Sequence, residues 1–126
     1  MRLNQVTLAA VDMAASRGFF ESLGFQVIVD SAPRYMRLLA PDGHSTLSLH
    51  ETSNPPSGDG PCIYFECDDL DARFADLTRA GVVFETPPED QTWLWREAWL
   101  RDPTGNRVCL FHAGANRIDP PWRVSS

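Results

Sequence analysis

The segment TWLWREAWLRDPTGN, residues 92–106, carries the side chains best suited to recognising a small molecule. Four of them share one strand parity and are expected to point to the same side of a strand: Trp93, Trp95, Glu97 and Trp99. A carboxylate among aromatic rings is costly to bury unless a partner or a bound proton offsets its charge, and both arrangements occur at functional sites. The pattern therefore predicts either a binding site for a small organic molecule or acid–base chemistry at Glu97.

The same side chains also fit structural explanations. Tryptophan is enriched at interfaces and buries a large area in any setting, so the indoles suit a dimer interface or an aromatic stripe in the core equally well. Glu97 would then belong to a structural ion pair. The candidate partners for its charge are Arg107 and His50.

Composition limits the classes of function. The chain has 126 residues, 43% of them hydrophobic, which is enough for one core and too few for two domains of ordinary size. A net charge of −6 without a cluster of Lys or Arg argues against a nucleic-acid partner. No apolar run approaches the roughly 18 residues that span a membrane, and no secretion-signal pattern is visible. We therefore expect a cytoplasmic protein with no membrane partner, whose three sparse cysteines are reduced.

The apolar pattern predicts two similar sets of elements that position these side chains. The first half predicts a strand, a helix and three strands, at residues 2–11, 13–24, 25–31, 34–41 and 45–51. The second half predicts the same order, at residues 62–69, 70–81, 82–87, 92–102 and 107–113. We expect one structural domain made of a first module at 1–52, a linker at 53–60, a second module at 61–114 and a C-terminal tail at 115–126.

Strand alternation separates a polar or mixed face from an apolar one. The polar parity holds Gln5, Thr7, Thr46, Ser48, His50, Cys62, Tyr64, Glu66, Arg107, Cys109 and Phe111. The opposite parity holds Val6, Leu8, Leu47, Leu49, Ile63, Phe65 and Cys67. This is the pattern of a sheet whose apolar face packs helices while its other face lines a semi-polar pocket. The expected class is α+β, with the helices on one face of a mixed sheet.

Two segments, taken with the duplicated element order, resemble a known superfamily. They are VDMAASRGFFESLGF early in the chain and LRDPTGNRVCLF near its end, where DP-x-G-N joins two strands. Over residues 3–113 the chain resembles the vicinal oxygen chelate superfamily, which includes glyoxalase I, fosfomycin-resistance and bleomycin-resistance proteins and extradiol dioxygenases. The resemblance implies two βαβββ modules that form an open, curved sheet around a metal and substrate site, with the helices outside and often a second subunit completing it.

The resemblance also implies four metal-ligand positions, and none holds the superfamily's usual His or Glu. These positions are Gln5, Ser48, Cys62 and Cys109. Serine is a poor ligand for divalent metals, whereas two thiols favour softer ions such as zinc. One interpretation is a zinc site made of both thiols with Gln5 or His50; the other is a pair of small apolar side chains that line a pocket. We expect the usual metal chemistry to be lost.

Two hypotheses of function follow from the resemblance and from these departures. The first is a metal-free homodimer, similar to the bleomycin-resistance branch, that binds a small organic molecule in a tryptophan-lined cavity and has no cofactor. The alternative is a divalent-metal-dependent lyase or dioxygenase with non-standard ligands. If the protein is an enzyme, Glu97 is the candidate catalytic residue. The expected ligand-binding residues are Gln5, Thr7, Ser48, His50, Cys62, Tyr64, Trp95, Trp99, Arg107 and Cys109.

Overall fold

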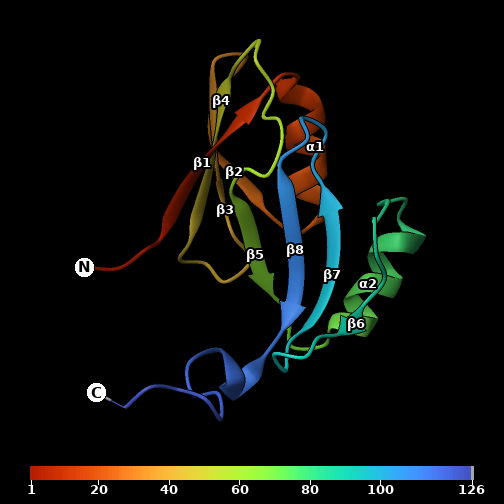
Figure 1. Cartoon of the computed structure of the whole chain (residues 1–126). Coiled ribbons are helices and arrows are strands. Elements are labelled where there is room, and N and C mark those ends of the chain that lie inside the picture. Colours follow the sequence, from red (N-terminus) through yellow and green to blue (C-terminus); the bar gives the residue numbers. More distant parts are fainter. Residues whose placement is uncertain (126) are drawn as a thin grey trace. The chain divides into compact units, whose positions relative to one another are not determined.

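The computed structural model describes residues 1–125, in which eight strands and two α-helices follow one another in the order βαβββ-βαβββ (Figure 1). The strands form two four-stranded mixed sheets, and neither sheet closes into a barrel. The expected α+β class is therefore confirmed. The chain divides into two compact units. The first unit combines Met1–Pro61 with Arg101–Asn106, and the second combines Cys62–Leu100 with the chain from Arg107 onward.

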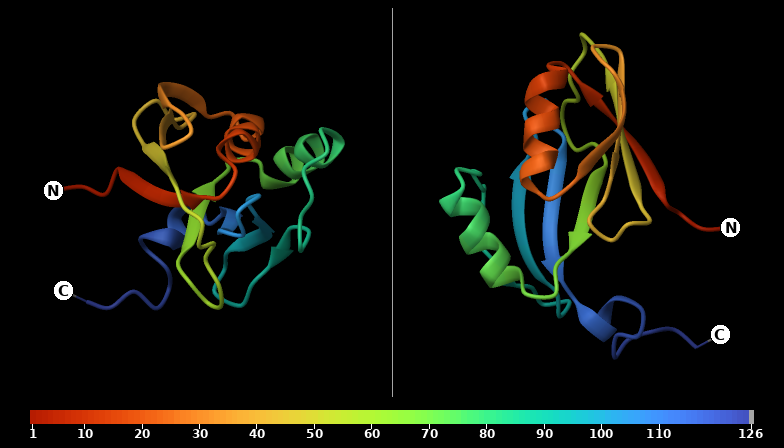
Figure 2. Two further views of the ribbon diagram at one scale, coloured as in Figure 1. Left: turned by 90° about the horizontal axis from the view of Figure 1, so that it is seen from above. Right: turned by 180° about the vertical axis from the view of Figure 1, so that it is seen from behind.

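The sheet of the first unit has the order β1-β4-β3-β2, with β1 and β4 parallel and the other pairs antiparallel. Its elements are β1 (Gln5–Ala10), α1 (Met13–Ser22), β2 (Gln26–Ser31), β3 (Tyr35–Leu39) and β4 (Thr46–Glu51). Helix α1 packs against β2 and β4, as the views in Figure 2 show. Phe20 of the helix and Leu47 and Leu49 of β4 are buried, so the apolar parity forms the core of this unit.

The DP-x-G-N turn belongs to the first unit, because it is fastened to the β1–α1 connection. The buried Asp102 carboxylate accepts the backbone N–H groups of Thr104 at 3.0 Å and Asn106 at 2.8 Å. The Asn106 amide in turn donates to Ala9 O at 2.9 Å, and Thr104 Oγ1 accepts from Val11 N at 3.1 Å. Each polar group of the motif thus satisfies backbone that a turn would otherwise leave unpaired.

The sheet of the second unit has the order β5-β8-β7-β6, with β5 and β8 parallel and β6 and β7 antiparallel. Its elements are β5 (Cys62–Glu66), α2 (Leu70–Arg79), β6 (Glu89–Asp90), β7 (Arg96–Arg101), β8 (Arg107–His112) and the 3₁₀-helix η1 (Gly114–Arg117). Helix α2 begins at the N-cap Asp69, which accepts from Ala72 N, and it packs against β8.

The strand expected at 82–87 is wrong. Glu85 N and Thr86 N both donate to the same carbonyl of the neighbouring strand, that of Trp99, at 2.8 and 3.3 Å. Trp99 N donates to the Thr86 side chain instead of to its backbone, so no regular ladder forms. Pro87 and Pro88 have no N–H to donate, so a ladder cannot continue past them. The strand on this side of β7 is instead the two-residue β6, which pairs with Glu97 and Arg96.

The strand expected at 92–102 is too long at its start, because residues 92–94 form a turn and β7 begins at Arg96. Leu94 N donates to Gln91 O at 3.1 Å and closes the reversal between β6 and β7. Leu94 has a φ of 68°, a left-handed conformation that is uncommon for a branched side chain. The turn carries neither Gly nor Pro, so no conventional turn signal marks it.

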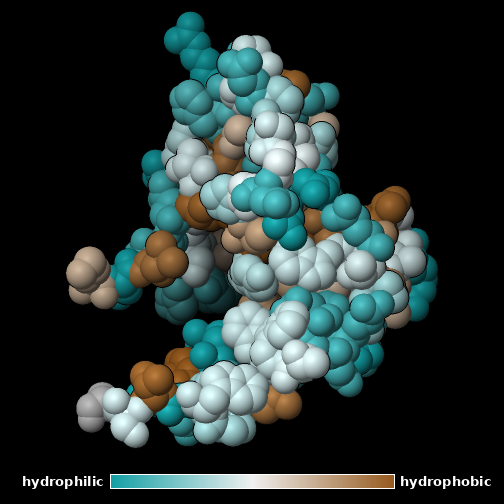
Figure 3. All heavy atoms as spheres, in the orientation of Figure 1, coloured by the Kyte–Doolittle hydropathy of each residue, from teal (hydrophilic) through white to brown (hydrophobic). Residues whose placement is uncertain are grey.

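On the face drawn in Figure 3, hydrophobic residues occur in small separate groups among hydrophilic ones. Some large apolar side chains are nevertheless exposed in the second unit, including Trp93 and Leu94 of the β6–β7 turn. Within residues 1–125, neither helix combines the length and apolar character needed to cross a membrane.

Candidate functional site

Glu97 of β7 is the centre of the polar contacts on one face of the second sheet. It is only 4% exposed, and each of its carboxylate oxygens accepts a hydrogen bond from an indole. Trp93 Nε1 donates to Oε2 at 2.8 Å, and Trp99 Nε1 donates to Oε1 at 3.0 Å. Trp99 lies in the same strand, whereas Trp93 lies in the turn before it. Two neutral donors therefore take the place of the cationic partner expected from the sequence, and they join the turn to the sheet.

Four rings beside this carboxylate form one aromatic group: Tyr64 of β5, Trp95, Trp99 and Phe111 of β8. Trp95 stacks on Phe111 with centroids 4.5 Å apart and planes 16° apart. The Tyr64 ring stands edge-on to the other three rings at 5.6–5.9 Å. Phe111 is buried, whereas Tyr64 is 45% exposed, so the group has an inner side and an open side. Such edge-on and stacked pairs gain stability beyond their area burial.

Arg107 lies over the aromatic group without pairing with Glu97. Its guanidinium carbon is 4.9 Å from the centroid of the Trp99 ring, a cation–π distance. The Trp99 indole therefore binds an anion through its N–H and a cation through its face. Both charged groups that contact this indole, Glu97 and Arg107, therefore belong to the protein itself.

The surroundings of the aromatic group disfavour additional negative charge. Burial, followed by the nearby Glu97 charge, raises the pKa of the Cys109 thiol to about 12. Burial also raises the pKa of Tyr64, with further contributions from Cys109 and Glu97. At neutral pH both groups are therefore protonated. The face presents one buried carboxylate among neutral side chains, with Arg107 at its margin.

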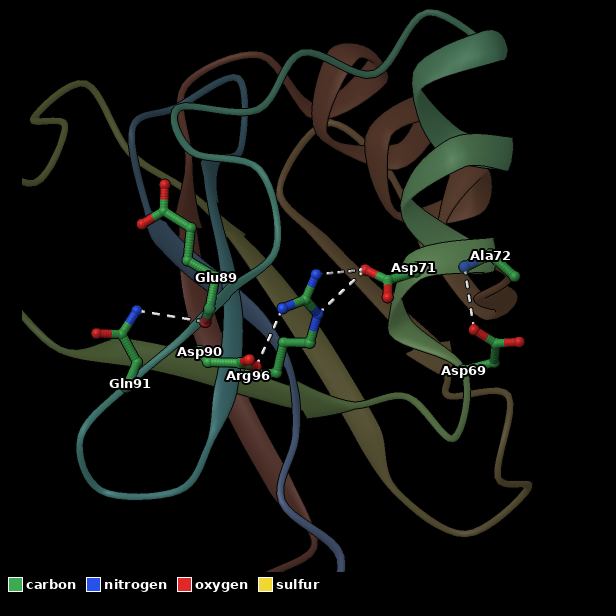
Figure 4. A network of polar contacts seen from close by, with 7 residues as sticks. All are labelled: Asp69, Asp71, Ala72, Glu89, Asp90, Gln91 and Arg96. Atoms are coloured by element: carbon green, nitrogen blue, oxygen red, sulfur yellow. Dashed lines mark hydrogen bonds and ion pairs between the residues drawn. The ribbon is translucent and has the colours of Figure 1, made fainter.

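An ion-pair network joins the β6–β7 hairpin to helix α2 (Figure 4). The Arg96 guanidinium donates to Asp71 of α2 at 3.0 Å and to Asp90 of β6 at 3.0 Å. Two carboxylates from different elements thus converge on one side chain, and they raise the pKa of Arg96. Because exposed pairs contribute little energy singly, the value of this network lies in fixing the hairpin's position.

The corresponding face of the first sheet is polar rather than aromatic. The Tyr35 hydroxyl lies 2.7 Å from Ser48 Oγ and accepts a hydrogen bond from Arg37 Nε at 2.9 Å. Ser48 is fully buried, and its hydrogen bond, followed by the hydrogen bond and charge of Arg37, lowers the pKa of Tyr35 despite some desolvation. Near one end of the face Thr46 Oγ1 donates to Gln5 Oε1 at 2.9 Å.

Comparison with known proteins identifies the family. The sequence model of the Glyoxalase/Bleomycin resistance protein/Dioxygenase superfamily matches residues 2–110. The chain belongs to this superfamily. A search of the curated proteins gives no match.

Solved structures of other superfamily members share the fold of this one. A glyoxalase/bleomycin resistance protein/dioxygenase from Nocardioides is 20% identical with a TM-score of 0.79, covering 99% of this chain and 90% of its own. A member from Sphaerobacter thermophilus is 25% identical with a TM-score of 0.71, covering 89% and 97%. A lactoylglutathione lyase from Agrobacterium tumefaciens is 18% identical with a TM-score of 0.75, covering 94% and 96%. At these identities the likeness establishes the fold.

Two of the four positions that the resemblance assigns to metal ligands are engaged in hydrogen bonds within the protein. Gln5 accepts from Thr46, and the buried Ser48 is hydrogen bonded to Tyr35. Within residues 1–125, no group of three or more His, Cys, Asp or Glu side chains is arranged to hold a metal ion.

The sequence-predicted residues fall into two sets, one in each unit. The second unit brings together Tyr64, Trp95, Glu97, Trp99, Arg107 and Cys109, with Cys62 on the same strand as Tyr64. The first unit holds Gln5, Thr7, Ser48 and His50 on neighbouring strands, with Gln5, Thr7 and His50 exposed. Sequence reasoning missed Tyr35 and Arg37, although both share the parity that faces Ser48 and so carried a usable signal.

Proposed function

We propose that this superfamily member binds a small, flat organic molecule carrying a cationic or hydrogen-bond-donating group, on the aromatic face of its second unit and without a metal. The observation that supports this most is a buried carboxylate held by two indoles beside a half-open aromatic group. A flat ring gains contact area on the exposed Tyr64 and the partly exposed Trp95, and a cation is attracted by the ring faces and by the Glu97 charge.

The hydrogen bonds of Glu97 favour binding over acid–base catalysis. A general base must approach the proton that it removes, but both oxygens of Glu97 already accept indole N–H groups in a buried position. Each oxygen retains a further acceptor site for a ligand donor. Glu97 therefore acts as a fixed anion that orients Trp93 and Trp99 and sets the charge preference of the face.

Benzamidinium and benzamide test this proposal, because they have nearly the same shape and differ in charge. We expect benzamidinium to change the intrinsic tryptophan fluorescence and to bind more tightly than benzamide. Trp95→Ala should weaken both ligands through lost contact area. Glu97→Gln should weaken benzamidinium about tenfold, which corresponds to losing one charge-assisted contact, and should leave benzamide nearly unchanged.

Trp122→Phe is the matched control for the fluorescence signal, since Trp122 lies in the C-terminal tail and is 55% exposed. This variant should lower the total emission and leave both affinities unchanged. Equal affinity of the two ligands for the unmodified protein would contradict the charge preference. Unchanged benzamidinium affinity in folded Trp95→Ala and Glu97→Gln variants would remove the aromatic face from the binding site.

The metal-free part of the proposal rests on the donors at the four ligand positions, and elemental analysis tests it. Protein purified without added metal should carry no stoichiometric zinc, nickel or iron after dialysis. About one such ion per chain that survives dialysis would favour the lyase or dioxygenase alternative.

We also propose that the protein is a cytoplasmic homodimer. Strand β1 ends one side of the first sheet, and an edge strand leaves backbone groups for a second copy to cover. Light scattering at micromolar concentration should give twice the mass of the 14.1 kDa chain, and a monomeric mass would contradict the proposal.

A further inference from the structure

We propose that the polar face of the first sheet is a binding site for a carboxylate, built by Arg37, Tyr35 and Ser48. These residues belong to the first unit, whereas the aromatic face belongs to the second, and the proposal stands on other observations. The site includes Ser48, one of the positions at which the resemblance implies a metal ligand. The positive charge of Arg37 favours an anion there instead of a metal cation.

Arg37 supplies the positive charge. Its Nε–H donates to the Tyr35 hydroxyl at 2.9 Å, and its guanidinium carbon is 5.6 Å from the centroid of the Tyr35 ring. Among residues 1–125, no carboxylate lies within ion-pair distance of Arg37. Within these residues, the charge of Arg37 is therefore not neutralised by an ion pair. Its terminal N–H groups are suited to bind a planar acceptor with two oxygens, and a carboxylate is such an acceptor.

The register of the sheet fixes the other two members beside Arg37. Arg37 of β3 lies directly opposite Ser48 of β4, and Ser48 lies opposite Thr7 of β1. Ser48 Oγ is fully buried and holds the Tyr35 hydroxyl at 2.7 Å, so the hydroxyl is fixed from two sides. A tyrosine held in this way can turn its O–H from Ser48 to an incoming anion while Ser48 and Arg37 keep the oxygen in place.

The same arrangement disfavours a metal cation. Arg37 lies directly opposite Ser48 in the ladder, and its guanidinium is fixed by a hydrogen bond to Tyr35. Its charge would repel a divalent ion at that position. An anion is attracted by that charge and receives N–H and O–H donors. The charge of Arg37 and the donors of Tyr35 and Ser48 thus favour an anion over a cation at this place.

The test is a titration with acetate and benzoate at constant ionic strength, followed by the NMR signal of the Arg37 Nε–H group. We expect both carboxylates to shift this signal in a saturable way and chloride to leave it unshifted. By calorimetry, benzoate affinity should fall about tenfold or more in Arg37→Gln, since the charged donor is lost, and should fall less in Tyr35→Phe.

Arg34→Gln is the matched control, because it removes the same charge from an exposed residue just before β3. It should leave benzoate affinity unchanged. The proposal is wrong if Arg37→Gln and Arg34→Gln weaken benzoate equally, if chloride shifts the Arg37 signal as the carboxylates do, or if neither carboxylate shifts it. None of these outcomes bears on benzamidinium, so the two proposals can fail independently.

Discussion

The two sheets place the same residue type in opposite environments. Tyr35 of the first sheet is held by Ser48 and Arg37, which lower its pKa, whereas Tyr64 of the second sheet is surrounded by rings and by groups that raise its pKa. Both tyrosines lie on the polar parity of their strands. The difference therefore comes from the neighbours that each sheet supplies and not from the position of the strand residue.

Ser48 and Cys109 make the comparison sharper, because they occupy matched places. Each is the third residue of the last strand of its module and each is fully buried. In the parallel pair Ser48 lies opposite Thr7, and Cys109 lies opposite Tyr64. Ser48 Oγ is hydrogen bonded to the Tyr35 hydroxyl, whereas Cys109 packs in a cluster with aromatic side chains. One backbone arrangement can therefore carry a polar face or an aromatic face, according to a few side chains.

The largest effect we predict is on the two hydrogen bonds that Trp93 and Trp99 donate to Glu97. Glu97→Gln should lower the free energy of unfolding by about 2 kcal/mol, because an amide can accept from only one of the two indoles and hydrogen bonds to a charged group are the stronger kind. Urea unfolding measures the change. Glu89→Gln is the control: Glu89 lies opposite Glu97 in β6 but is exposed, and its substitution should change stability by less than about 0.5 kcal/mol. Equal effects of the two substitutions would show that the indole hydrogen bonds of Glu97 do not contribute specifically to stability.

An exchange of Ser48 and Cys109 should give the next largest effect. Cys109→Ser brings a hydroxyl into an apolar and aromatic environment and should cost about 1–2 kcal/mol. Ser48→Cys replaces a good hydrogen-bond partner of Tyr35 by a weak one and should cost about 1 kcal/mol. Urea unfolding of both single variants measures these costs. A stabilised Cys109→Ser variant would contradict the view that the second face is built for burial rather than for hydrogen bonding.

Much of the fold followed from the sequence, because strand parity and turn chemistry act locally. The alternation of Leu47, Ser48 and Leu49 predicted which side packs the helix, and DP-x-G-N predicted the turn. The prediction of a strand at 82–87 was wrong because apolar residues at these positions suggest a strand. In the structure, Phe84 instead packs on Phe74 of α2, with ring centroids 4.7 Å apart.

The contacts of the candidate site depended on features that lie outside any one strand. Trp93 reaches Glu97 only because the chain reverses at Leu94, where no Gly or Pro marks a turn. The expected cation partner of Glu97 was wrong because an indole N–H is also a strong donor to a carboxylate, which a charge-pairing argument does not consider. Tyr35 and Arg37 were missed although their strand was predicted, because the resemblance assigns no ligand position to that strand.

The finest test of the comparison is the ionisation of the two tyrosines, the only two in the chain. As the pH rises, Tyr35 should lose its proton below the usual value near 10, because Ser48 and Arg37 stabilise the phenolate. Tyr64 should lose its proton above that value, because burial and nearby negative groups oppose its charge. The near-ultraviolet absorbance of tyrosinate should therefore rise in two steps.

Single substitutions assign these steps. Tyr35→Phe should remove the lower step and Tyr64→Phe the upper one. Arg37→Gln should move only the lower step to higher pH, whereas Glu97→Gln should move only the upper step to lower pH, since it removes a negative neighbour. Two tyrosines that ionise together near pH 10, or a lower step that survives in Tyr35→Phe, would mean that the two faces do not differ in the way their neighbours indicate. A shift of both steps by either Arg37→Gln or Glu97→Gln would show instead that the faces are electrostatically coupled.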